Sequence, residues 1–199
     1  MKKILLLSAL LIFSFSHSQS KELIEKNEKM MTFASEGKLI DAIELGVEMI
    51  DNPDFIKLKP VKRVMLLNSL GQWFKEVSEY DYAIIVNQDA LDITDGHIYD
   101  VGPDAGNSIR AEILNNIGVV YSAKNQKSIA FSYYDEAVSE IRKNKKRYSD
   151  RIKGLVYTSR AICKHDLGKR GVCKDIKKAD KYANAYPRAR ELFYKFGCF

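Results

Sequence analysis

A spacing of residues that occurs twice is the feature that most constrains this chain. Six positions follow one another at offsets of four, three, nine, four and three residues, and five of the six residue types are kept in kind. The first copy is Leu67, Gly71, Phe74, Ala83, Asn87 and Ala90, and the second is Leu114, Gly118, Tyr121, Ala130, Tyr134 and Ala137. Because offsets of three and four place residues on one face of a helix, each copy predicts two helices joined by a short turn. The small residues would allow the two helices to cross closely, and the large residues would fill the space around the crossing.

Weaker versions of the pattern extend it toward both ends. Phe33, Ala42, Gly46 and Met49 keep the nine, four and three offsets, and Val172, Ile176 and Ala179 keep the four and three. Pro187 favours the start of one more helix, which would cover the last pair. The expected helix pairs cover 20–36 with 38–51, 59–77 with 79–93, 107–124 with 126–142, and 147–166 with 170–184.

This pattern resembles the tetratricopeptide repeat (TPR), a helix–turn–helix unit whose copies stack. The resemblance implies an all-α, right-handed superhelix of about four helix pairs plus a C-terminal capping helix. It also implies a non-catalytic scaffold that binds a protein or peptide partner in a concave groove lined by the first helix of each pair. Carried onto this sequence, the groove would present Asn68, Gln72, Lys75, Glu112, Asn115, Val119 and Ser122.

Side-chain amides suit that task because each offers donors and acceptors to a peptide backbone. The same residues could instead form a solvated polar face. A small molecule or glycan as the ligand, and a purely structural subunit, are the alternative functions.

The N-terminus has the pattern of a secretory signal peptide over residues 1–18. Lys2 and Lys3 precede an apolar run from Ile4 to Phe15, and small residues stand at Ser16 and Ser18, where a signal peptidase would cut. A membrane anchor would need roughly 20 apolar residues, which is more than this run provides. We therefore expect cleavage before Gln19, a single helical repeat domain over 19–199 with no transmembrane segment, and export. The C-terminal segment, with its run from Asp175 to Ala179 and a terminal Phe-x-Cys, resembles the ending of many exported repeat proteins of Gram-negative bacteria, which implies the periplasm or the medium of such a bacterium. A role in the assembly of envelope complexes would fit that location.

Charge and motif content argue against nucleic-acid binding and catalysis. The formal net charge of +6 falls to +4 without Lys2 and Lys3, and an exported chain rarely meets nucleic acid. No catalytic or cofactor-binding motif is present, and residues two apart on a helix, such as Cys163 and His165, point in different directions. The acidic residues around the 94–106 loop lack the EF-hand spacing, so no metal and no cofactor is expected.

The cysteines yield the most specific prediction. Cys173 follows Val172, and the matching residues of the earlier repeats are Ile43, Ile84 and Phe131, which should face the next helix. For Cys173 the next helix is the capping helix, which is followed by Cys198. We therefore expect a Cys173–Cys198 disulfide with Cys163 as a buried free thiol, as an oxidising compartment would permit. Three unpaired thiols, or a disulfide involving Cys163, are the alternatives.

Overall fold

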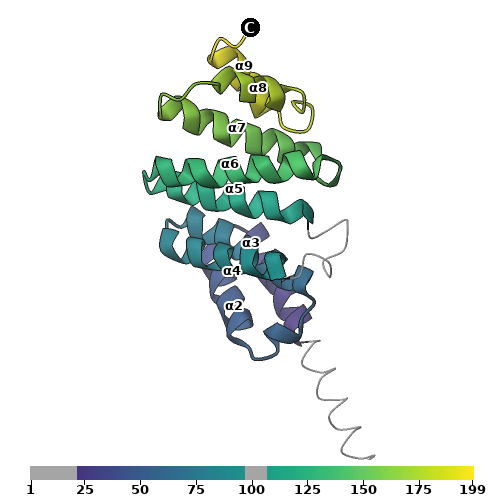
Figure 1. Ribbon diagram of the computed structural model, residues 1–199. Coiled ribbons are helices and arrows are strands. Elements are labelled where there is room, and N and C mark those ends of the chain that lie inside the picture. The colour runs from purple at the N-terminus through teal and green to yellow at the C-terminus, as the bar shows by residue number, and fades with distance from the viewer. Residues whose placement is uncertain (1–21, 97–106) are drawn as a thin grey trace, which may run out of the picture. The chain divides into compact units, whose positions relative to one another are not determined.

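The computed structural model describes residues 22–96 and 107–199, which form helices joined by short turns (Figure 1). No β-strand occurs in these two stretches, so the all-α expectation is confirmed. No helix within them is both long enough and apolar enough to cross a bilayer. The expected signal peptide, and the loop residues 97–106, lie outside the described residues.

The chain divides into two compact units, and the boundary between Leu66 and Leu67 falls inside helix α3 (Pro60–Glu76). The first unit contains a helix over residues 22–35, α2 (Leu39–Asp51) and the short 3-10 helix η1 (Phe55–Lys57). The second unit contains the rest of α3, α4 (Tyr80–Gly96), α5 (Asn107–Ala123), α6 (Lys127–Lys143), η3 (Lys145–Arg147), α7 (Asp150–Asp166), α8 (Val172–Asp180) and α9 (Arg188–Lys195).

Within the second unit, each helix from α4 to α9 packs against the next one in the chain. The first helices of neighbouring pairs also touch, because α5 contacts α7. This is the packing expected of stacked helix pairs, in which a first helix meets both its own partner and the first helix of the next pair.

All four pairs turn in the same way between their two helices. The third position of the repeated spacing is Phe33, Phe74, Tyr121 and Lys164 in the four pairs. The residue four positions later has a positive φ in each pair: Gly37, Ser78, Asn125 and Gly168. At each turn the N–H of that residue bonds to the carbonyl three residues back, and the next N–H bonds to the carbonyl five residues back. These hydrogen bonds pair carbonyls that the end of the first helix would otherwise leave unsatisfied. The turn therefore confirms the repeat register in the first and last pairs, where the side-chain pattern is weakest.

The glycines of the pattern make room for one particular side chain of the second helix. A Cβ added at Gly118 would lie 2.6 Å from Cε1 of Tyr134, and one added at Gly71 would lie 2.1 Å from Nδ2 of Asn87. The nearest side chains are thus Asn87 and Tyr134, each four residues after the alanine that was expected to face the glycine. Ala83 and Ala130 are nevertheless fully buried, as the pattern predicts.

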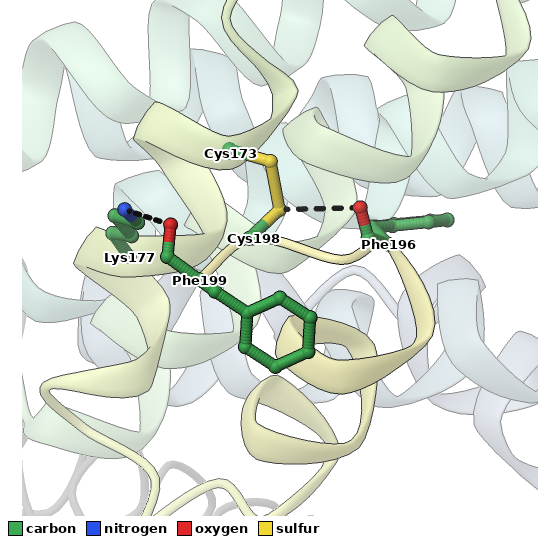
Figure 2. The surroundings of a disulfide bond; sticks show 5 residues. All are labelled: Cys173, Lys177, Phe196, Cys198 and Phe199. Atoms are coloured by element: carbon green, nitrogen blue, oxygen red, sulfur yellow. Dashed lines mark hydrogen bonds between the residues drawn. A yellow bond between two sulfur atoms is a disulfide. The ribbon is translucent and has the colours of Figure 1, made fainter.

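The last pair ends in a cross-linked cap, as expected. A disulfide joins Cys173 of α8 to Cys198, which follows α9, with 5.1 Å between their Cα atoms (Figure 2). Beside it, Nζ of Lys177 donates a hydrogen bond to the carbonyl of Phe199 at 2.9 Å. Cys163 is a free, buried thiol. Together with the buried cluster of Ala161, Ile176, Leu192 and Cys198, these contacts confirm the predicted pairing and the capping role of α9.

A buried ion cluster joins α7 to both neighbouring helices. The guanidinium of Arg160 donates to both carboxylate oxygens of Asp175 on α8, at 2.6 and 2.8 Å, and to Asp135 on α6 at 2.6 Å. Nζ of Lys164 adds a contact to Asp175 at 2.8 Å. Asp175 is completely buried and Arg160 is 3% exposed. Little water reaches either charge, so each is compensated mainly by its ion-pair partners in this cluster.

Candidate binding groove

Two adjoining hollows lie along the first helices of the second unit. The polar hollow has a volume of about 190 Å³ and the apolar hollow about 410 Å³, and neither is enclosed. They share Val119 of α5 and Leu155 of α7, so the two hollows adjoin at these residues, and together they are called the groove below. The polar hollow is further lined by Gly71, Gln72 and Lys75 from α3, by Glu112, Asn115, Asn116 and Val120 from α5, and by Arg151 from α7.

The polar hollow brings together four of the residues proposed for the groove from the sequence: Gln72, Lys75, Glu112 and Asn115. They come from two different helix pairs, and they meet because α3 and α5 occupy equivalent places in successive pairs. Val119 lines both hollows, and Ser122 lines the apolar one. Asn68 lines neither hollow. Its Oδ1 accepts a hydrogen bond from Nδ2 of Asn116 at 2.9 Å.

The repeated spacing begins at Leu67, at Leu114 and at the equivalent Tyr157. In these three successive pairs the next residue is polar and buried. Asn68 is 8% exposed, and Asn115 and the equivalent Thr158 are each 1% exposed. The Oδ1 of Asn115 and the Oγ1 of Thr158 have no hydrogen-bond partner within the described residues. A buried polar atom left in this way costs free energy. A ligand that reached either atom with a polar group would recover part of that cost.

Cations dominate the charged residues of the groove. Lys75 and Arg151 line the polar hollow, Arg188 lines the apolar one, and Glu112 is the single acidic side chain among the lining residues. Burial raises the pKa of the Glu112 carboxyl above its ordinary value, and the nearby charge of Arg151 opposes this shift only in part. The closest approach of that pair is 3.9 Å, so Glu112 is poorly compensated when ionised.

The apolar hollow lies farther toward the C-terminus. Its lining is Val119, Ser122 and Ala123 of α5, Tyr134 of α6, Leu155, Thr158, Ser159, Ile162 and Cys163 of α7, and Tyr186 and Arg188. Burial raises the pKa of the Tyr134 hydroxyl far above its usual range, and a hydrogen bond with Ser122 offsets this only slightly. Ser122 is therefore already engaged within the protein.

Cys163 and His165 do not form a catalytic pair. The thiol of Cys163 donates to the carbonyl of Lys127 at 3.4 Å, and burial raises its pKa. The ring of His165 instead stacks on Phe196, with 4.7 Å between ring centroids. A buried thiol with a raised pKa stays protonated, and its proton is donated to a carbonyl and not to the His165 ring, which is the opposite of an activated nucleophile.

Several lining residues were not predicted. Thr158 could have been found, because it occupies the slot of Asn68 and Asn115 in the next pair. Tyr186 and Arg188 belong to the connection after α8 and the start of α9, where no periodic pattern places them. Over residues 22–96 and 107–199, no group of three or more His, Cys, Asp or Glu side chains is arranged to hold a metal ion.

Comparison with known proteins supports the fold. No protein-family model matches the sequence, and the comparison with curated proteins returned no match. Among solved structures, the chain is similar to BtubC (BKLC) from P. vanneervenii, with a TM-score of 0.62 and 17% identity over 85% of this chain. It is also similar to the nearly identical TPR-like repeats of a Podosopora anserina protein assigned as a kinesin light chain, with a TM-score of 0.60 and 13% identity over 82% of this chain.

The protein therefore has a TPR-like fold, a helical-repeat scaffold of a kind commonly used for protein interaction. The chain spans 63% of the length of BtubC and 76% of the Podosopora protein. At these identities the likeness concerns the fold alone, so the function has to be argued from the groove.

Proposed function

We propose that this protein is an exported, non-catalytic scaffold that binds an extended peptide segment of a protein partner in the groove formed by the two hollows. The observation that carries the proposal is that two adjoining hollows are lined by three successive first helices, α3, α5 and α7. A peptide can follow such a surface from one repeat to the next, whereas a small molecule is usually held in a single pocket that buries most of its surface. Neither hollow is enclosed, which favours a peptide over a small molecule or glycan.

The lining chemistry supports the same proposal. The amides of Gln72, Asn115 and Asn116 offer donors and acceptors to a peptide backbone. Beside them, the apolar hollow offers space for a side chain of the bound segment. Binding would use the surface of the folded scaffold and would require no cofactor or metal.

Export is the second part of the proposal. The N-terminal charge and apolar pattern supports it, as does the disulfide, because such bonds persist mainly in oxidising compartments. We propose that the mature chain begins at Gln19 and acts in the bacterial envelope, where assembly of protein complexes would supply a partner. N-terminal sequencing of the protein recovered from the periplasm or medium tests this. Retention of Met1 in the mature protein would contradict it.

The binding proposal is tested by capture from envelope extract with two matched tryptophan variants. Gln72→Trp places an indole in the polar hollow at a half-buried position, and Ser132→Trp places one on an exposed face of α6 that lines neither hollow. The wild-type protein and Ser132→Trp should retain the same partner, and Gln72→Trp should lose it. Equal capture by all three proteins would place the binding surface elsewhere.

A further inference from the structure

The apolar hollow has a wall that comes from outside the repeat pattern. Tyr186 reaches it from the connection between α8 and α9, and Arg188 from the start of α9. This segment lies directly on α7 because Gly154 leaves room for it: a Cβ at Gly154 would lie 2.8 Å from the Cβ of Tyr186. The glycine therefore has a specific function in bringing the wall close to the first helix.

The same wall is closed into a covalent loop. The disulfide joins Cys173 to Cys198 (Figure 2). Tyr186 and Arg188 both lie between these two cysteines in the sequence. Leu192 and Cys198 are buried against Ala161 of α7 and Ile176 of α8, so the loop is also held by packing. The hollow is thus built from a rigid helix pair on one side and a tethered segment on the other, which favours a preformed site.

The wall of the hollow includes a polar group that is unpaired among the residues that the structure describes. Oγ1 of Thr158 is in the lining, its side chain is 1% exposed, and it has no hydrogen-bond partner within the described residues. The surrounding side chains are mainly apolar, among them Val119, Leu155 and Ile162. The hollow therefore presents a mostly apolar wall, and its volume of about 410 Å³ leaves room for one large side chain.

We propose that the apolar hollow is the anchor subsite of the groove, which takes one large apolar side chain of the bound peptide between α5, α7 and the disulfide-closed loop. This assignment rests on the proposed function, because the occupant is a residue of a chain that continues past Val119 and Leu155 into the polar hollow. The side chain of the anchor residue packs against Val119, Leu155 and Ile162. The amide-lined polar hollow receives the backbone next to it, so the two hollows divide the tasks of apolar burial and backbone pairing.

A displayed library of random ten-residue peptides tests the proposal, with selection on the immobilised, oxidised mature protein. The selected peptides should share one large apolar residue at a fixed position. A fluorescein-labelled copy of a selected peptide then measures affinity by anisotropy. Two filling variants approach the hollow from opposite sides: Ser159→Trp from α7 and Ala123→Trp from α5. Each should weaken binding about tenfold or more, and Ser132→Trp should leave it unchanged.

The loop is tested with the same peptide. Replacing both Cys173 and Cys198 by serine should weaken binding by a similar factor while the helical circular dichroism is retained. Unchanged affinity in this variant would remove the tethered loop from the site.

The two levels of the proposal fail in different ways. If peptides are selected and Gln72→Trp abolishes their binding, but they share no apolar residue and both filling variants bind normally, the anchor is refuted and the peptide groove stands. If no peptide is enriched over a control surface, the proposed function fails and the anchor fails with it. Circular dichroism of each variant identifies any that has not folded, and the second filling variant then decides.

Discussion

Replacing Gly118 by alanine tests the close crossing of α5 and α6. The added Cβ would lie 2.6 and 2.8 Å from two ring carbons of Tyr134, and that ring is 4% exposed and packed between α5 and α7. A methyl group forced into such a place costs about 1–3 kcal/mol by overpacking. Alanine is favoured over glycine within a helix by about 1 kcal/mol. The net expectation is a loss of up to about 2 kcal/mol of unfolding free energy, where helix propensity alone would predict a gain.

The control is a glycine without such a neighbour. Gly96 lies at the end of α4, and a Cβ there would meet nothing within 4 Å. Gly96→Ala should therefore leave stability unchanged or raise it by up to about 1 kcal/mol. Chemical denaturation followed by helical circular dichroism measures both variants. Leucine at position 118 should cost more than alanine, because its additional carbons meet the same ring.

A double variant identifies Tyr134 as the cause. Tyr134→Val removes the ring that the new methyl group would meet. Adding Gly118→Ala in this background should then raise stability by about 1 kcal/mol, so the effect of the same substitution changes sign. If Gly118→Ala is as stable as Gly96→Ala, or if its effect is the same with and without the ring, the steric reasoning is refuted.

Three further predictions concern charge and the cross-link. Asp175→Asn should lower the unfolding free energy by about 3–5 kcal/mol, because it leaves Arg160 and Lys164 without their buried counter-charge. Asp180→Asn, at the end of the same helix α8, breaks a more exposed pair with Arg190 of α9 and should cost about 1 kcal/mol or less. An equal loss in these two variants would contradict a special role for the buried cluster. Burial raises the folded-state pKa of Glu112, so the folded protein binds this proton more tightly than the unfolded chain, and stability falls as the pH rises through that pKa. Glu112→Gln should accordingly be more stable than wild type at pH 7, and the difference should shrink below about pH 4; denaturation curves at the two pH values that show a constant difference would disprove it. Replacing Cys173 and Cys198 by serine removes a cross-link that spans 25 residues, and the melting curve should report a loss of about 3–4 kcal/mol, whereas an unchanged curve would show that packing alone holds the cap.

The helix pairs and the cross-link could be predicted because they depend on periodicity. Residues at offsets of three and four share a helix face, so the repeated spacing was enough to place each helix and its buried side. The repeat register also predicted the disulfide. Cys173 occupies a position that faces the next helix in earlier pairs, and its partner Cys198 follows that next helix. Such information is local and survives even where the residue types of the first and last pairs have changed.

The groove was predictable only in part, because a position on a face does not determine what the side chain meets. Gln72, Lys75, Glu112 and Asn115 do come together, since equivalent slots of successive first helices are neighbours. The pairing of Asn68 with Asn116 depends on the separation of two helices and on rotamers that spacing does not specify. The wall at Tyr186 was missed because α8 ends at Asp180, before the expected residue 184, and the segment that follows has no regular pattern.

The four turns of the repeat have a consequence for how such a chain diverges. Their hydrogen bonds join main-chain N–H and carbonyl groups, and the residue with positive φ is glycine in two turns, serine in one and asparagine in another. Glycine and asparagine adopt this conformation readily, and the strain of a serine there is small beside the packing of two helices. Substitution at these positions can therefore accumulate while the angle between the helices is preserved. The backbone geometry of the turn is then conserved while the residue types change. This accounts for the likeness to TPR-like structures at 13–17% identity in a sequence that no family model matches.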